Sequence, residues 1–245
     1  MSPILELNLT VCAVWLGARI LRAGGGAPVR LVALFLLLTA LGTTGLARGS
    51  ALPDTSAELR FAVLAAAHLA ISAGLWCLAG FSWLTFGARS PWRRRLAVGL
   101  GGALSGAYLA QWILDGFSVV PGPATLTALA CRTACMGWVS IETAAYHAVL
   151  RRRQRLGLAD PLVANRVLLW SLWTGAIAIL MLAGAILRVL SVEDAALATA
   201  IYRSVPFLSV TAVLSLVAAM ALWLSFLPPA PYRAWIERRA HLSER

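Results

Sequence analysis

The sequence predicts an all-α, polytopic membrane helical bundle with seven transmembrane helices, and three observations support this fold class. Of its 245 residues, 60% are hydrophobic and 13% are charged, whereas about 25% are charged in an average soluble domain. The mean hydropathy is +0.80. The apolar residues gather in seven runs close to the roughly 20 residues that cross a bilayer as a helix. We therefore expect a single membrane domain over residues 1–245, without a separate soluble domain.

The runs give the predicted spans 3–21, 29–47, 61–86, 96–114, 124–150, 163–187 and 195–226. The first is the weakest because Glu6 and Asn8 interrupt its start and Arg19 lies near its end. An interfacial helix is the alternative there. The second has no charged residue except at its edges, and the third carries His68.

The fourth span contains Gly102 and Gly106 at GxxxG spacing, which lets a second helix approach closely. We expect a helix-packing contact there, with dimerisation as the alternative. The fifth holds Arg132, Glu142 and His147, and in the sixth Asn165 and Arg166 stand near the start. The seventh contains Pro206, which predicts a kink. Residues 229–245 combine aromatic residues with several arginines, as expected of a short interfacial helix.

The arginines predict the orientation. Of the 21 basic residues, all arginine, sixteen fall on one side of this seven-span arrangement and four on the other, with Arg132 between them. Cytoplasmic loops carry the positive excess, so we expect the N-terminus outside, the C-terminus and its tail in the cytoplasm, and a multi-pass protein of the cell inner (plasma) membrane. The net charge of +11 then sets topology, and we expect no nucleic-acid partner.

Several functions are excluded by the residues that are missing. A retinal pump needs a lysine for its Schiff base, and the sequence has none. A catalytic zinc site needs about three converging ligands, but the predicted spans hold only His68 and His147. These lie at depths that differ by roughly 20 Å at about 1.5 Å per residue. We expect no metal, no cofactor and no catalytic residues, and so a protein that is not an enzyme.

Ionisable residues at membrane depth are candidates for function. His68, Arg132 and Arg203 are predicted within the outer turns of their helices, and Asp115 at the rim. If they converge, they form a positive outward cavity that suits a carboxylate or phosphate. The alternative is that these side chains pair internally or extend to the interface.

Two further ionisable residues lie in the fifth span. Glu142 and His147 are five residues apart, which places them on different helix faces. Glu142 is expected to pair with an arginine of a neighbouring helix, and His147 to face the lipid headgroups.

The loop between the fifth and sixth spans is the most distinctive segment. It has either a structural role, with arginines at headgroups and an aspartate capping the next helix, or it docks a cytoplasmic partner. The residues concerned are Arg151, Arg152, Arg153, Arg155, Asp160, Asn165 and Arg166.

The strings LGLADPLVANRVLLW and FLPPAPYRAWIERRA resemble a group of bacterial seven-span inner-membrane proteins without an established activity. The resemblance covers the second half of the chain and implies topology, not chemistry.

Taken together, these features favour a non-enzymatic, receptor-like or sensory protein. Its outer half would bind a small anionic or amphiphilic ligand, and its basic inner loops would contact a cytoplasmic protein. Two alternatives stay open: a small-molecule or proton-coupled transporter that uses Arg132, Glu142 and His68, and a membrane scaffold or assembly factor whose partner is chiefly the lipid bilayer.

Overall fold

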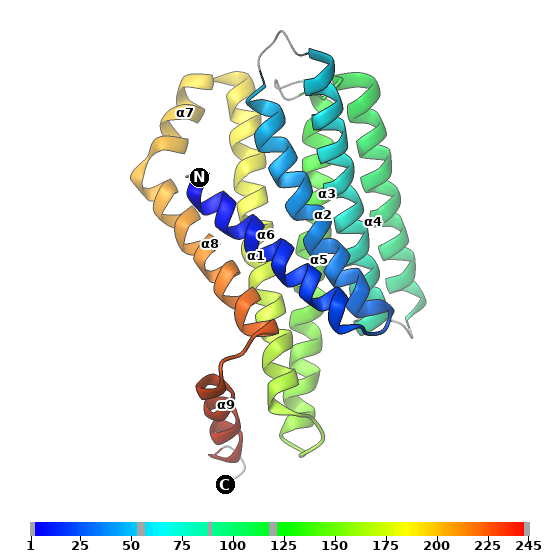
Figure 1. The fold of residues 1–245 in the computed structure, drawn as a ribbon, viewed down its shortest axis with the longest axis vertical. Helices are drawn as coiled ribbons and strands as arrows, with labels where there is room; N and C mark the ends of the chain where they lie inside the picture. The colour runs from blue at the N-terminus through cyan, green and yellow to red at the C-terminus, as the bar shows by residue number, and fades with distance from the viewer. Residues whose placement is uncertain (1–2, 53–56, 88–89, 118–121, 243–245) are drawn as a thin grey trace. The chain divides into compact units, whose positions relative to one another are not determined.

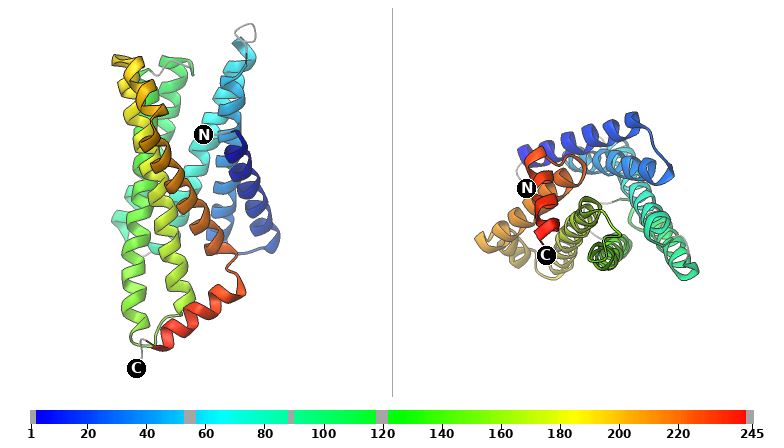
Figure 2. Two further views of the ribbon diagram at one scale, coloured as in Figure 1. Left: turned by 90° about the vertical axis from the view of Figure 1, so that its left-hand side faces the viewer. Right: turned by 90° about the horizontal axis from the view of Figure 1, so that it is seen from below.

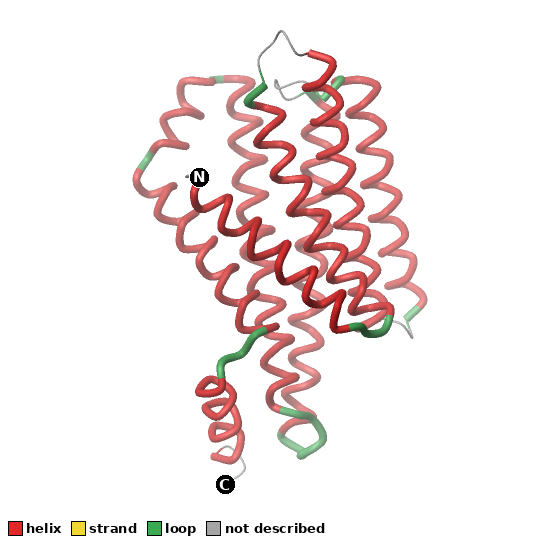
Figure 3. The backbone as a smooth tube through the Cα atoms, viewed as in Figure 1, coloured by secondary structure: helices red, strands yellow, loops and turns green. Residues whose placement is uncertain are grey.

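The computed structural model describes residues 3–52, 57–87, 90–117 and 122–242, and within these residues all regular structure is helical (Figures 1 and 3). The predicted all-α class is confirmed. The helices in chain order are α1 (Pro3–Ala23), α2 (Ala27–Ser50), α3 (Ala57–Phe86), α4 (Pro91–Ala110), η2 (Gln111–Asp115), α5 (Pro123–Gln154), α6 (Pro161–Glu193), α7 (Ala195–Arg203), α8 (Val205–Phe226) and α9 (Ala230–Leu242).

Six segments of the described chain are long and apolar enough to cross a bilayer: α2, α3, α4 with η2, α5, α6 and α8. These identify a multi-pass membrane protein. Five are longer than the predicted spans, since polar turns extend them at one or both ends; α6, for example, has 33 residues. At about 1.5 Å per residue it is about 50 Å long, so its ends reach beyond a hydrocarbon core of about 30 Å.

The predicted membrane domain divides into two compact units, Met1–Cys135 and Met136–Arg245, with the boundary inside α5. In the first unit, α2 and α3 run side by side (Figure 1). Three glycines of α2 allow this close packing. A Cβ added at Gly42 would lie 2.5 Å from Ile71 Cγ1, and one at Gly45 or Gly49 would lie 2.8 Å from the side chain of Ala67 or Leu64.

The glycines of α4 behave differently from the prediction. An added Cβ at Gly102 or Gly106 would meet no described atom of the first unit within 4 Å, so the expected helix-packing contact does not form within this unit. Gly101 makes the contact instead, because the ring of Trp76 lies against it and the Trp76 indole N–H donates to its carbonyl oxygen at 2.8 Å. The side of α4 that packs against α3 therefore carries Gly101 and not the predicted pair Gly102 and Gly106.

In the second unit, the end of α5 and α6 are neighbouring antiparallel helices (Figure 2). The Ser140 hydroxyl donates to the Ser171 carbonyl at 3.0 Å, and the Ser171 hydroxyl donates to the Ser140 carbonyl at 3.2 Å. Trp170 of α6 packs edge-on against Phe226 of α8, with ring centroids 5.6 Å apart. Reciprocal serine contacts and an aromatic pair thus connect the helices of this unit.

The predicted span 195–226 is not one kinked helix but two helices, α7 and α8, which meet at Ser204. The Ser204 hydroxyl accepts a hydrogen bond from the Phe207 amide at 3.4 Å and caps α8, and Pro206 lies in its first turn. Proline has no N–H and is tolerated at a helix start. Because a serine cap precedes it, Pro206 begins a helix here instead of bending one.

The tail prediction placed a helix within 229–245, and α9 is that helix. The Asn165 amide donates to the Tyr232 hydroxyl at 2.9 Å, which attaches α9 to the first turns of α6. Tyr232 stacks on Trp235 at 5.9 Å, and Trp235 is exposed. An exposed tryptophan beside a tyrosine is typical of residues at a membrane interface.

Candidate ligand site

Arg132 is the centre of a buried polar network in the first unit. One of its terminal nitrogens, Nη2, lies 2.9 Å from His68 Nδ1, 3.5 Å from Ser72 Oγ and 3.4 Å from Gln111 Oε1. Arginine carries only donors, so His68 Nδ1 accepts, and the imidazole is the neutral tautomer with its proton on Nε2. The bond to His68 is the only one of the three within the usual range of 2.7–3.2 Å.

The network continues from Gln111 to Asp115 through Thr125. The Gln111 amide donates to the Thr125 hydroxyl at 3.3 Å. Asp115 Oδ2 accepts from the Thr125 amide at 2.6 Å and from its hydroxyl at 2.7 Å. A carboxylate at the first turn of α5 satisfies an N–H that has no intrahelical partner and complements the helix dipole. Asp115 thus caps α5, and a Cβ at Gly122 would collide with its carboxylate.

Gln111 and Asp115 are the two ends of η2, a π-helical turn that continues α4. Such turns add a residue to the helix repeat and occur frequently at functional sites. The turn ends at Gly116 and Phe117, which both have positive φ, at 55° and 52°. For a bulky residue such as Phe117 this backbone conformation is unusual and costly.

The strained Phe117 is held by aromatic packing. Its ring stacks on His68 at 5.2 Å and lies 5.5 Å from the ring of Tyr108 and 5.7 Å from that of Phe61. Phe117 itself is buried. The His68 ring is therefore fixed on one side by Arg132 and on its face by Phe117.

A groove of about 410 Å³ lies beside this network, between α3 and α4. Its walls are mostly apolar and include Leu69, Ala73, Trp76 and Leu109, with Tyr108 alongside. Ser72 belongs both to the groove and to the Arg132 network. A volume of this size lies in the usual range for small-ligand sites. The buried guanidinium of Arg132 is separated from the groove by the side chain of Ser72.

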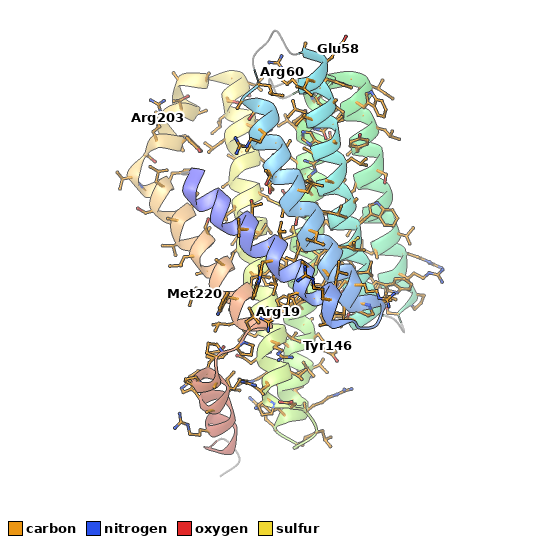
Figure 4. All side chains as sticks on the ribbon, in the orientation of Figure 1. Arg19, Glu58, Arg60, Tyr146, Arg203 and Met220 are labelled. Atoms are coloured by element: carbon orange, nitrogen blue, oxygen red, sulfur yellow. The ribbon has the colours of Figure 1, made fainter. Side chains whose placement is uncertain are left out.

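The predicted ligand residues are distributed as follows. His68, Arg132 and Asp115 all belong to one network, although Asp115 reaches Arg132 only through Thr125 and Gln111. Arg203 lies at the end of α7 in the other unit, with its side chain exposed (Figure 4). The geometry thus brings together three of the four.

Glu142 and His147 both lie in the second unit, on α5. Glu142 is buried, only 5% exposed. His147 is half-buried, and its Nδ1 donates to the Ala164 carbonyl at 2.8 Å. His147 is thus hydrogen-bonded to the neighbouring helix α6. The turn of α5 that carries His147 therefore lies beside the turn of α6 that carries Ala164.

The residues of the α5–α6 turn have separable roles. Asp160 Oδ1 accepts from the Leu162 amide at 2.7 Å and caps α6, which confirms the predicted cap. Asn165 binds Tyr232 of α9. The arginines Arg151, Arg152, Arg153, Arg155 and Arg166 are exposed.

Sequence reasoning missed Ser72, Gln111, Thr125 and Phe117. Gln111 carried a usable signal, since an amide inside a predicted span needs hydrogen-bond partners. Ser72 and Thr125 carried none, because serine and threonine in membrane helices usually bond to their own backbone. The positive φ of Phe117 depends on tertiary packing and has no sequence signature.

The described residues contain no group of three or more histidine, cysteine or acidic side chains arranged to hold a metal ion. The sequence matches no protein-family model, and comparison with curated proteins and with solved structures found no match either. The function is therefore argued from the site itself.

Proposed function

We propose that this protein is a non-enzymatic, receptor-like or sensory membrane protein that binds a small amphiphilic ligand in the α3–α4 groove. The observation that carries the proposal is the double role of Ser72, which lines the groove and contacts Arg132 Nη2. The apolar part of the ligand lies along Leu69, Ala73 and Trp76. Its anionic group lies next to Ser72, where the charge of Arg132 compensates the cost of burying it.

The membrane arrangement that accompanies this proposal is the predicted one. In this arrangement α1 is the first span and brings the six long apolar segments to seven. It has 21 residues and folds back along α2 after the short turn Gly24–Gly26, where Gly24 and Gly25 have positive φ. Gly17 of α1 packs against Leu37 of α2. The arginine distribution supports an external N-terminus, a cytoplasmic C-terminus and a bacterial inner membrane.

The groove can be blocked without touching the network. Ala73 is half-buried in the groove wall, so Ala73→Phe fills the groove and leaves the Arg132 contacts in place. The probe is parinaric acid, a fluorescent carboxylate with an apolar chain, which accepts excitation energy from tryptophan such as Trp76. Purified protein should show saturable transfer that Ala73→Phe abolishes.

The matched control is Leu182→Phe, at an exposed site of α6, which should bind the probe as the unaltered protein does. Equal transfer in the Ala73→Phe and Leu182→Phe variants would refute groove binding. In that case the α3–α4 groove would be filled only by bilayer lipid. A membrane scaffold would then explain the protein better than a receptor.

A proton-coupled transporter is the second candidate, because Glu142 is a carboxyl buried in a membrane helix. Carboxyl groups inside membrane helices often mark ion or proton pathways in transporters. Proteoliposomes with an imposed pH gradient separate the two functions. Transport predicts uptake of the probe that Glu142→Gln abolishes, and a receptor predicts binding without uptake.

A further inference from the structure

The turn between α5 and α6 presents charge and apolar surface together. We define the basic tip as Arg151, Arg152, Arg153, Arg155, Leu156 and Leu158, all of them exposed. Leu156 and Leu158 are 71% and 73% exposed. Both leucine amides donate to the Arg153 carbonyl, at 3.1 and 2.9 Å, around Gly157 with φ 67°. This closed helix end gives the two leucines a defined position.

The tip lies beyond the lipid headgroups. Arg166 and Arg188 delimit the apolar stretch of α6, and at about 1.5 Å per residue they are about 33 Å apart, close to the hydrocarbon thickness. His147 is bonded to Ala164, so His147 lies just outside this stretch. Helix α5 continues for seven residues beyond His147 and ends at Gln154, about 10 Å farther out, and Leu156 and Leu158 lie in the turn that follows it. The headgroup layer is only about 5–8 Å thick, so Leu156 and Leu158 stand in water.

The positive charge of the tip is not compensated within the described part of the chain. The backbone groups of its arginines take part in the hydrogen bonds of the helix end, but none of the side chains of Arg151, Arg152, Arg153 and Arg155 forms a hydrogen bond or ion pair with a described residue. The neighbouring carboxylate, Asp160, is directed to the Leu162 amide. The four guanidinium groups are therefore available to a partner, and the two leucines are exposed beside them.

We propose that the basic tip is the docking site for an acidic cytoplasmic protein that accepts Leu156 and Leu158 in an apolar groove. Carboxylates pair bidentately with guanidinium groups, and arginine is enriched at protein interfaces. Lipid phosphates fit the arginines but not the leucines, because water, not acyl chains, surrounds the leucines at this distance from the bilayer. A protein surface satisfies both.

The test is site-specific photocross-linking in the membranes of the cells that make the protein. A photoreactive amino acid replaces Leu156 or Leu158, and adducts are identified by mass spectrometry. The expected product is a protein adduct whose cross-linked peptide is acidic. An adduct to phospholipid, or no adduct from either position, would overturn the proposal. Leu172, an exposed α6 residue within the apolar stretch, should give lipid adducts and thus verifies the chemistry.

Charge dependence is the second requirement. Replacing the four arginines of the tip with glutamine should lower the adduct yield roughly sixteenfold, at about twofold for each exposed pair. The control Arg188→Gln with Arg203→Gln removes charge elsewhere and should change nothing. Because loss of arginines can alter topology, unaltered membranes are also tested at about 1 M salt, where screening acts within about 3 Å. An adduct that resists both treatments would contradict an acidic partner.

Discussion

The distances around Arg132 predict that its partners contribute unequally to stability. Replacing His68 with phenylalanine removes the acceptor at 2.9 Å while keeping an aromatic ring to stack on Phe117. Ser72→Ala removes only a contact at 3.5 Å. Hydrogen bonds to charged groups contribute about 1.5–3 kcal/mol in general, and polar contacts between membrane helices average about 0.6 kcal/mol with a maximum near 1.7.

We therefore expect His68→Phe to lower the free energy of unfolding by about 1.5 kcal/mol and Ser72→Ala by less than about 0.5 kcal/mol. Thermal unfolding of the detergent-solubilised protein, followed by tryptophan fluorescence, measures both. With the scaling of soluble proteins of this size, the Tm should fall by about 3–6 °C for His68→Phe and by about 1 °C for Ser72→Ala. Equal losses, or a larger loss for Ser72→Ala, would refute the assigned order of contacts.

Three further predictions follow from the packing. Gly42→Ala should destabilise the protein by about 1–3 kcal/mol because its Cβ would lie 2.5 Å from Ile71. Gly102→Ala, with open space around it, should not destabilise it. Thermal unfolding compares the two variants, and equal effects would contradict the α2–α3 contact. Asp115→Ala should lower the free energy of unfolding by about 0.5–2 kcal/mol because it removes the cap of α5. Hydrogen exchange of the Thr125 amide should be faster in this variant than in the control Asp160→Ala, which removes the cap of α6 instead. An unchanged exchange rate of the Thr125 amide would exclude the cap. Asn165→Leu and Tyr232→Phe should each increase protease cleavage of α9. Because both remove the same hydrogen bond, the double variant should be cleaved no faster than either single variant. Additive effects would exclude the hydrogen bond between Asn165 and Tyr232.

The fold class was predictable because the bilayer imposes a strong rule on sequence. Apolar runs of about 20 residues have to be helical, since every backbone polar group must be satisfied within its own segment. Helix ends were less accessible. Ser204 and Pro206 together begin α8, and a proline in an apolar run predicts a kink or a start equally well.

Glycine spacing alone does not tell a used packing face from an unused one, because Gly45 and Gly49 of α2 have the same GxxxG spacing as Gly102 and Gly106 of α4. The GxxxG pair of α4 is open, while Gly42, Gly45 and Gly49 of α2 make the close contact. Spacing shows which face allows a close approach, but the neighbouring helix decides whether that face is used.

The candidate site was predicted in part. His68 and Arg132 stood out because charged and imidazole side chains are rare inside membranes, and they are bonded to each other. The role of Asp115 as a helix cap depends on the π-helical turn and the loop after it, which bring residues of α4 and α5 together. The groove consists mainly of leucine, alanine and tryptophan, whose chemistry is the same as that of ordinary lipid-facing surface.

In the proposed function, Arg132, acting beside Ser72, gives the groove a preference for an anionic amphiphile. The most direct measurement compares the affinity of the purified protein for parinaric acid and for its uncharged methyl ester, in the unaltered protein and in Ser72→Ala. The unaltered protein should bind the acid at least about tenfold more tightly, equivalent to about 1.4 kcal/mol, and Ser72→Ala should reduce this preference while still binding the ester. Equal affinities for acid and ester in the unaltered protein would contradict the proposed function.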